Sequence, residues 1–279
     1  MQQTLMALIT ALLLTGWRPS TAPSRLLGGT RRFRGVAMSS APRLLLTSSG
    51  LTTPALEASF RRMLESSSSV EPPRITMLVT AQMAPSGTPS ARSPGELRRR
   101  RWTSAKKGGR EVEAQLGLPV ECIDCARDDV SSLTKALTGA DCIWVTGGNT
   151  FFLWHHMMRS GISELVRERV LEHGAVYVGC SAGAIVAGST IRTAFWKGWD
   201  DPAAGGALAD VDWSDGDSLQ GMGLVADAAF FPHYDAEQWA GLIREREHEV
   251  ERVVRLSDDG AHAYVEGDPV EAARDDGAA

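Results

Sequence analysis

Short apolar runs alternate with amphipathic segments along most of the chain. The apolar runs are rich in branched side chains and lie at residues 43–49, 74–81, 120–125, 141–146 and 175–178. Segments with helical spacing lie between them, at residues 54–62, 96–116, 130–138, 151–158 and 163–172. Runs of this length and type indicate strands that are buried on both faces. The alternation predicts a three-layer α/β fold, with a parallel sheet and helices on both of its faces.

The pattern changes after the fifth apolar run. Residues 197–222 are rich in Gly, Asp and Ala and are typical of an inserted loop. An apolar segment at 228–232, an amphipathic helix at 235–252 and a last strand near 261–265 follow. We therefore expect one α/β domain over residues 41–270 and a tail over 271–279. Because the chain ends soon after the last strand, whether a carboxy-terminal strand is missing stays open.

The amino-terminal segment has a different composition. The first acidic residue is Glu57, whereas residues 4–16 are apolar and too short to span a bilayer comfortably. We interpret residues 1–40 as a targeting segment for a plastid, a mitochondrion or the secretory pathway. The alternative is a first helix of the fold, and a chain without a working signal would be cytoplasmic.

Composition sets limits on the partners. The chain has 279 residues, is 43% hydrophobic and carries a net charge of −5, which is typical of a globular protein and argues against nucleic acid as the main partner. The basic run 98–101 is better explained as a solvated helix face. Four cysteines are too few for a disulfide framework, and the single Cys122-Ile-Asp-Cys125 motif only weakly indicates a metal or redox site.

The strongest candidate for chemistry is Ser181, in Gly179-Cys-Ser-Ala-Gly183. A strand precedes this motif, and small apolar residues compatible with a helix follow it. G-x-S-x-G between a strand and a helix is typical of a nucleophile elbow, which exposes the serine hydroxyl on a strained turn. The amide of Ala182, at the start of the helix, is placed to donate to an oxyanion. Cys180 is the alternative nucleophile, but its position before the turn predicts that it points into the fold.

A serine nucleophile needs a base, and the base needs a carboxylate that orients it. His233 follows Phe230-Phe231-Pro232, and this rigid bend after an apolar run favours it among the six histidines. Seven acids lie between Ser181 and His233: Asp200, Asp201, Asp210, Asp212, Asp215, Asp217 and Asp227. Asp200 and Asp201 follow Trp196-Lys-Gly-Trp199, which is apolar enough to shield a carboxylate.

Four motifs stand in order along the chain: Val145-Thr-Gly-Gly-Asn-Thr-Phe-Phe-Leu153, Gly179-Cys-Ser-Ala-Gly-Ala184, Thr190-Ile-Arg-Thr193 and Phe231-Pro-His233. They resemble the dipeptidase E and cyanophycinase family of serine peptidases, most closely its dipeptidase E branch of aspartyl dipeptidases. The resemblance covers about residues 42–267. It implies a fold similar to class I glutamine amidotransferases (flavodoxin-like), with the nucleophile elbow after the fifth strand, and it implies no metal and no cofactor.

The resemblance also implies roles. Ser181 would be the nucleophile and His233 the general base, and the backbone amides of Gly148 and Ala182 would bind the oxyanion. A gap-free alignment places Trp196 where the family has its aspartate. We therefore assign the orienting acid to Asp200 or Asp201.

The implied reaction is hydrolysis of a dipeptide that begins with aspartate. Selecting aspartate needs a cation, preferably a guanidinium. Arg192, in the third motif, is the candidate, and a surface or interdomain ion pair is the alternative role for it. Asn149, in the first motif, is a second candidate substrate-binding residue.

Three other functions remain open. One is a hydrolase of the same scaffold with another specificity, such as a cyanophycinase-like enzyme. Another is an α/β-hydrolase esterase, which shares the order Ser, Asp, His but has a His-Gly-Gly-Gly segment that this chain lacks. The third is a non-catalytic binding protein on this fold. As partners we expect a small peptide substrate, no nucleic acid and no stable membrane insertion, and a homodimer stays open.

Overall fold

The computed structural model describes residues 41–67, 72–85, 90–204 and 211–267. The predicted targeting segment, residues 1–40, and the predicted tail, residues 271–279, lie outside the described residues.

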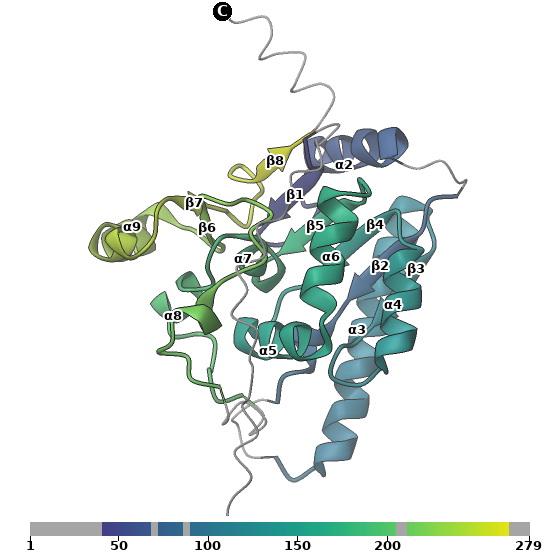
Figure 1. Ribbon diagram of the computed structural model, residues 1–279, viewed down its shortest axis with the longest axis horizontal. Helices are drawn as coiled ribbons and strands as arrows, with labels where there is room; N and C mark the ends of the chain where they lie inside the picture. The colour runs from purple at the N-terminus through teal and green to yellow at the C-terminus, as the bar shows by residue number, and fades with distance from the viewer. Residues whose placement is uncertain (1–40, 68–71, 86–89, 205–210, 268–279) are drawn as a thin grey trace, which may run out of the picture. The chain divides into compact units, whose positions relative to one another are not determined.

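Five parallel strands and one antiparallel strand form the main sheet (Figure 1). They are β1 (Leu44–Thr47), β2 (Ile75–Leu78), β3 (Val120–Ile123), β4 (Cys142–Val145), β5 (Val176–Cys180) and β8 (Tyr264–Glu266). Their spatial order is β3-β2-β4-β5-β1-β8, and β8 runs antiparallel to β1. Every residue of β1, β2, β4 and β5 is buried, as expected for strands that are covered on both faces.

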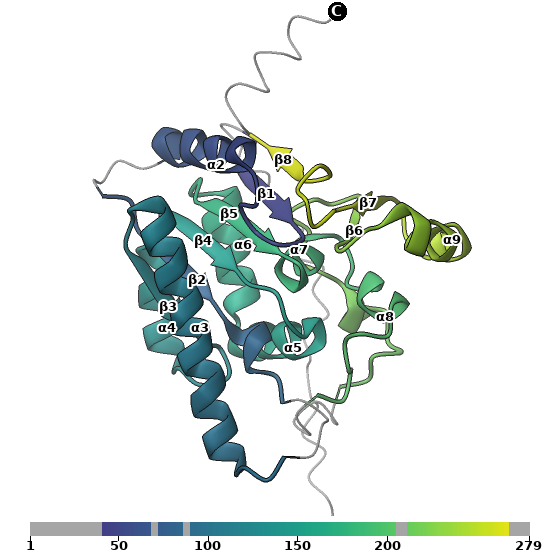
Figure 2. The ribbon, with the colours of Figure 1, turned by 180° about the vertical axis from the view of Figure 1, so that it is seen from behind.

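Helices cover both faces of this sheet. Helices α2 (Pro54–Ser67) and α3 (Pro94–Leu116) lie on the face that Figure 2 presents. Helices α4 (Val130–Thr138), α6 (Ile162–Leu171) and α7 (Ala182–Ala187) lie on the opposite face, nearer the viewer in Figure 1. Helix α5 (Thr150–Ser160) contacts α6, α7 and the 3₁₀ turn η1 (Thr80–Met83). The predicted three-layer α/β fold is confirmed.

A smaller unit packs beside the carboxyl end of β5. It contains α8 (Thr193–Trp196), β6 (Ala229–Phe231), α9 (Ala236–Arg246), the turn η3 (Glu247–Glu249) and β7 (Val253–Arg255). Strands β6 and β7 pair in parallel. The helix predicted at 235–252 ends at Arg246, where a 3₁₀ turn follows and Val250 is extended. Val253 and Val254 are β-branched and favour the strand β7 instead.

Within the described residues, much of the predicted loop at 197–222 packs onto the domain. Leu219 belongs to a 3₁₀ turn, η2 (Asp217–Leu219), and both Leu219 and Met222 are buried. The ring of Trp213 packs against Phe151 of α5, with centroids 5.0 Å apart. The insertion therefore contributes apolar side chains to the core.

Close backbone packing fixes the start of α7 against the sheet. A Cβ at Gly183 would lie 2.2 Å from the carbonyl oxygen of Val145 in β4, which no side chain can occupy without a backbone shift. The Tyr177 hydroxyl donates to the Gly183 carbonyl at 2.7 Å. The glycine thus lets α7 approach β4 and sets the direction of the elbow.

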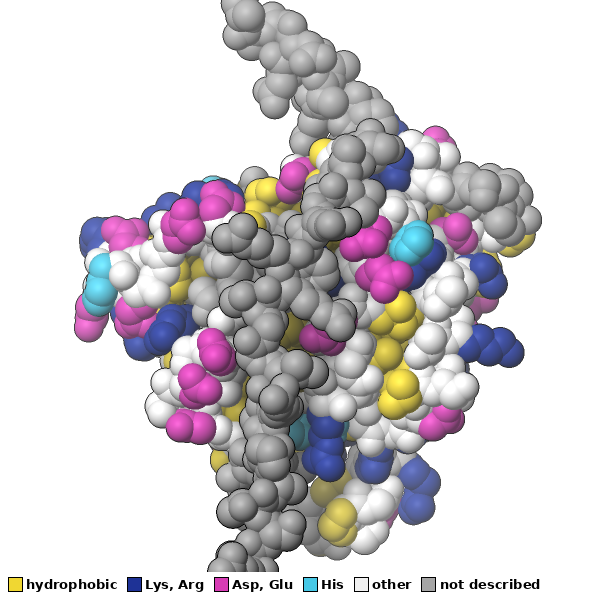
Figure 3. Space-filling model, viewed as in Figure 1, with side chains coloured by type: hydrophobic (Ala, Val, Ile, Leu, Met, Phe, Trp, Pro, Cys, Tyr) yellow, Lys and Arg dark blue, Asp and Glu magenta, His cyan; other side chains and the backbone are white. Residues whose placement is uncertain are grey.

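The outer surface is mixed in charge near α9. Figure 3 shows acidic and basic side chains intermingled there, and α9 contributes Glu237, Arg244 and Arg246. Within the described ranges, no helix combines the length and the apolar composition that crossing a bilayer requires.

Candidate active site

Ser181 occupies the turn between β5 and α7, as the sequence predicts. Its backbone has φ 51° and ψ −108°, a conformation that is costly for a residue with a side chain. The amide of Ser181 donates to the carbonyl of Thr47 at the end of β1, at 2.9 Å. The strand, strained serine and helix together form a nucleophile elbow.

His233 lies against this serine. Its Nε2 atom is 2.9 Å from Oγ of Ser181. Of the described residues other than glycine, only Ser181 and His233 have a positive φ, and that of His233 is 53°. Its amide donates to Oγ of Ser48 at 2.8 Å, and Ser48 donates in turn to the carbonyl of Leu256 at 2.7 Å. Ser48 therefore connects the end of β1, the strained turn at His233 and the segment after β7.

Asp258 provides the carboxylate beside the imidazole. Its Oδ1 atom is 2.7 Å from Nδ1 of His233 and accepts a hydrogen bond from Ser49, also at 2.7 Å. Partial burial opposes ionisation, but the hydrogen bonds from Ser49 and His233 lower the pKa of Asp258 below its ordinary value. In the tautomer with a proton on Nδ1, that N–H donates to Asp258 and Nε2 accepts the proton of Ser181.

The sequence analysis placed this carboxylate at Asp200 or Asp201, and the structure differs. Oδ2 of Asp200 accepts the Thr150 amide at 3.1 Å, and Oδ1 of Asp201 accepts the amide of Ala203 at 2.9 Å. Neither carboxylate bonds the imidazole. Asp258 lies outside the interval between Ser181 and His233: it follows β7 and reaches the site because β6 pairs with β7.

The two predicted oxyanion donors flank the serine. Ala182 is the first residue of α7, so its amide has no helical carbonyl to bond. Gly148 has φ 133°, and a Cβ there would lie 2.3 Å from the carbonyl oxygen of Ala81. Glycine is therefore required for the loop after β4 to pass η1 and line the cavity beside Ser181.

The two predicted substrate-binding residues lie outside the cavity lining. The amide of Arg192 donates to Oγ1 of Thr190, and Arg192 is half-buried at the start of α8. The Asn149 side chain caps α5 by accepting the Phe152 amide at 2.8 Å, and its Nδ2 donates to the Asp201 carbonyl at 2.9 Å. Asn149 thus orders the loop that carries Asp200 and Asp201.

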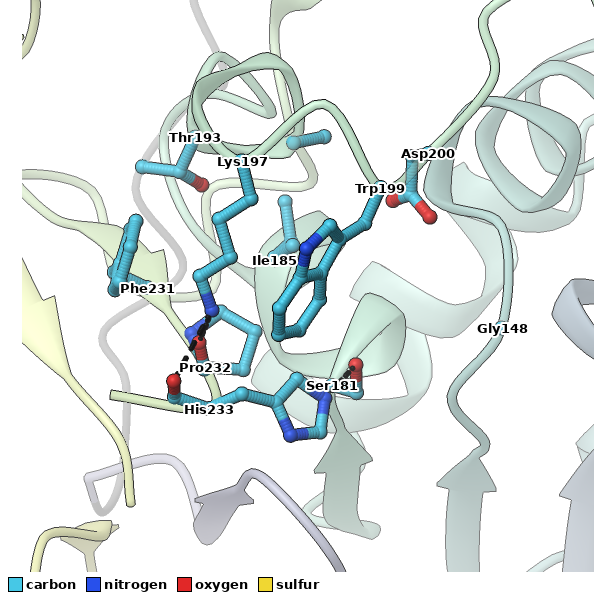
Figure 4. A pocket seen from close by; sticks show the side chains of 11 residues that line it. Gly148, Ser181, Ile185, Thr193, Lys197, Trp199, Asp200, Phe231, Pro232 and His233 are labelled. Carbon is cyan, nitrogen blue, oxygen red and sulfur yellow. Dashed lines mark hydrogen bonds between the residues drawn. The ribbon is translucent and has the colours of Figure 1, made fainter. Parts of the chain in front are cut away.

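A cavity of about 230 Å³ opens beside Ser181 and His233 (Figure 4). Pockets for drug-sized ligands measure roughly 300–1,000 Å³, so this cavity suits a small ligand. Apolar groups of Ile185, Phe231 and Trp199 form much of its lining. Trp199 is 59% exposed and its ring centroid lies 5.7 Å from that of His233.

Lys197 is a lining residue that the sequence analysis did not assign. Its ammonium donates to the carbonyls of Pro232 and His233. It also lies 4.2 Å from the ring centroid of Phe231 and 4.5 Å from that of Trp199. Burial lowers the pKa of Lys197 to about 8, against the opposing charges of Asp258 and Asp200. An apolar-looking Trp-Lys-Gly-Trp segment before two acids was the only sequence signal for this residue.

The cysteines have no visible part in this chemistry. Burial raises the pKa of the Cys180 thiol to about 11, and Thr47 donates to its sulfur at 3.8 Å, so this side chain points into the fold as predicted. Cys122 is half-buried and Cys125 is buried, and both are free thiols. Across the described ranges, no cluster of three or more His, Cys, Asp or Glu side chains is arranged to hold a metal ion.

Comparison with known proteins identifies a peptidase family for this chain. The model of peptidase family S51 matches residues 98–272. An uncharacterized peptidase of Listeria monocytogenes is 33% identical over 129 residues, which are 46% of this chain and 57% of that protein. A Peptidase E of Shewanella putrefaciens is 48% identical over 59 residues, which are 21% of this chain and 25% of that protein. The matched regions thus span between a quarter and little more than half of these relatives' own length.

The fold comparison extends over more of the chain. A crystal structure of a peptidase E protein from Listeria monocytogenes has a TM-score of 0.51 and 23% identity, and covers 81% of this chain and 98% of that one. At this identity the likeness concerns the fold alone. The family match covers more than half of the chain, including the segments that carry Ser181, His233 and Asp258. The chain therefore belongs to peptidase family S51.

Proposed function

We propose that the chain is a serine peptidase that hydrolyses dipeptides with amino-terminal aspartate, through the triad Ser181, His233 and Asp258. The observation that carries the proposal is the hydrogen-bonded series from Ser181 to His233 at 2.9 Å and from His233 to Asp258 at 2.7 Å. Such a series is the arrangement that activates a serine hydroxyl. The proposed peptidase domain comprises residues 41–270.

The reaction would proceed in two halves. His233 accepts the hydroxyl proton as Oγ of Ser181 attacks the peptide carbonyl, and Asp258 stabilises the imidazolium that forms. The amides of Gly148 and Ala182 donate to the oxyanion of the tetrahedral intermediate. His233 then protonates the leaving amine, which leaves an ester on Ser181. Water, deprotonated by His233, hydrolyses this ester and releases the amino-terminal residue.

The small cavity and the relatives support a dipeptide substrate. A volume of about 230 Å³ accommodates few groups beyond the residue that is attacked. The name Peptidase E of the Shewanella relatives and the four sequence motifs favour the aspartyl dipeptidase branch. Another specificity on the same scaffold, such as a cyanophycinase-like one, would leave the triad unchanged.

A panel of dipeptides tests the proposal. We expect the full chain to release amino acids from Asp-Leu faster than from Glu-Leu, Asn-Leu or isoaspartyl-Leu. The Ser181→Ala variant, with an unchanged circular dichroism spectrum, should lose this activity. Retained turnover in Ser181→Ala would reject the serine mechanism, and a preference for the isoaspartyl substrate would reject the proposed specificity.

A further inference from the structure

The cavity beside Ser181 carries one positive and one negative side chain from a short segment. Among the described residues that line it, Lys197 is the only Lys or Arg, and Asp200 is the only Asp or Glu. Figure 4 shows the two side chains on opposite sides of the cavity, with Trp199 between them and Ser181 below. Both belong to the short segment between α8 and Pro202.

Among the described residues, backbone carbonyls and aromatic rings surround the Lys197 ammonium, which forms no ion pair with a carboxylate. Its ammonium bonds the carbonyls of Pro232 and His233, and the ring of Trp239 lies 5.1 Å from it. Aromatic faces attract a cation, but they replace its hydration only in part. An ammonium has three N–H donors, and the two backbone carbonyls account for two of them. One donor remains for a ligand in the cavity.

Hydrogen bonds with α5 and the loop before it hold Asp200 in place. The Thr150 amide donates to Oδ2 at 3.1 Å, and the bond from Asn149 to the Asp201 carbonyl fixes the adjoining backbone. A carboxylate accepts about four hydrogen bonds, so the amide and side chain of Thr150 leave about half of this capacity unused. Burial raises the pKa of Asp200 above its ordinary value. A cationic ligand group would compensate for this loss of solvent.

The two charges of an amino-terminal aspartate complement this pair of side chains. In a peptide cleaved after its first residue, the carbonyl that Ser181 attacks is bonded to the carbon that bears both the α-ammonium and the side chain. Both groups therefore enter the cavity together. An amino-terminal aspartate presents one positive and one negative group, which complement Asp200 and Lys197.

We propose that Lys197 and Asp200 form a dipolar subsite, in which Asp200 binds the α-ammonium of the substrate and Lys197 binds its side-chain carboxylate. The inference rests on the proposed function, since it names the groups that select the substrate of that site. It assigns the cationic role to Lys197, which lines the cavity, in place of Arg192, which does not. The subsite favours a free amino terminus and so favours aminopeptidase-type cleavage.

Substitutions that keep the local packing separate the two charges. Lys197→Met keeps an apolar stem among the aromatic rings and removes the ammonium. Asp200→Asn keeps an oxygen for the Thr150 amide and removes the negative charge. Asp201→Asn is the matched control, because Asp201 is exposed and its carboxylate bonds the backbone outside the cavity.

Three substrates distinguish the groups that Lys197 and Asp200 would bind. They are Asp-Leu, Asn-Leu, which lacks the side-chain carboxylate, and succinyl-Leu, which lacks the α-amine. A charged hydrogen bond accounts for about 10- to 100-fold. We expect Lys197→Met to lower kcat/KM for Asp-Leu and succinyl-Leu by this factor and for Asn-Leu by less than about threefold. We expect Asp200→Asn to lower it for Asp-Leu and Asn-Leu but not for succinyl-Leu. Asp201→Asn should match the wild type on all three.

Equal losses on all three substrates would overturn the subsite, because they would show that both residues only support the position of His233. Wild-type behaviour of both variants would overturn it as well. A binding measurement keeps the subsite separate from catalysis. We expect calorimetric titration of Asp-Leu into Ser181→Ala to show binding that Lys197→Met or Asp200→Asn, added to that variant, weakens at least tenfold. Binding without turnover by the wild-type chain would support the subsite and reject the peptidase proposal, and turnover without selective losses would do the reverse.

Discussion

The two halves of the candidate active site are built in different ways. The nucleophile comes from the main sheet, where β5, Ser181 and α7 follow one another in sequence and neighbouring strands fix the turn. His233 and Asp258, the proposed base and acid, come from the smaller unit around β6 and β7, and they reach Ser181 only through tertiary contacts. A local pattern therefore determines the serine, whereas packing between distant segments determines its partners.

This difference explains what the sequence could and could not predict. The five apolar runs became β1 to β5. The predicted burial on both faces holds for β1, β2, β4 and β5 but was wrong for β3, which lies at the edge of the sheet and is only partly buried. The nucleophile elbow could be predicted from the sequence because glycine is needed on both sides of Ser181. His233 was found from the bend after Pro232. Each of these features lies within a few residues of the group that it positions.

Asp258 was missed for the opposite reason. Twenty-five residues separate it from His233, and its approach depends on the pairing of β6 with β7 and on the bond from Ser48 to Leu256. Asp258 and Asp259 are adjacent, and only the fold distinguishes the one that bonds the imidazole. The available signal was a short strand, Val253–Arg255, followed after two residues by two acids and a glycine.

The pair of adjacent acids gives the sharpest contrast within the smaller unit. Asp258→Asn should lower kcat by about 10²–10⁴-fold, because an amide at that position favours the wrong imidazole tautomer and no longer stabilises the imidazolium. Asp259→Asn should change kcat by less than about threefold, since its carboxylate bonds Ser257 and the Ala261 amide instead. Initial-rate kinetics on Asp-Leu would measure both. Equal losses of kcat in the two variants, or a larger loss in Asp259→Asn, would show that Asp258 is not the acid that orients His233.

Stability should respond most strongly where the elbow meets the sheet. Gly183→Ala places a Cβ 2.2 Å from the Val145 carbonyl oxygen, so we expect the free energy of unfolding to fall by about 1–3 kcal/mol. Gly108→Ala is the control, because a Cβ there meets open space and alanine favours the helix by up to about 1 kcal/mol. Urea unfolding followed by circular dichroism would compare them. A Gly183→Ala protein as stable as Gly108→Ala would show that the approach of α7 to β4 is not tight.

Ser48 should act on geometry without contacting the substrate. Ser48→Ala removes the acceptor of the His233 amide and the donor to Leu256, so we expect kcat to fall about tenfold with little change in KM. Ser66→Ala, on α2, removes a hydroxyl that bonds only a local carbonyl and should leave kcat unchanged. Steady-state kinetics would separate the two constants. A loss confined to KM would place Ser48 in substrate binding instead.

The smallest expected effect is a pH dependence of substrate binding. Lys197 has a pKa of about 8, set by burial against the charges of Asp258 and Asp200, and the ring of His233 also faces this region. Lys197 is positively charged below this pKa and loses its charge as the pH rises through it. We expect KM for Asp-Leu to rise a few-fold between about pH 7 and pH 9, while KM for Asn-Leu changes less. Parallel changes for the two substrates would assign the titration to another group.

The central claim is that Asp258 and His233, from the smaller unit, activate the serine of the main sheet. The most direct measurement is the rate at which a fluorophosphonate esterifies the protein, followed by intact mass and by peptide mapping. The account predicts a single modification on Ser181 of the wild-type chain, slowed strongly in both His233→Ala and Asp258→Asn but not in Asp259→Asn. Modification of Ser181 at the wild-type rate in Asp258→Asn would contradict it.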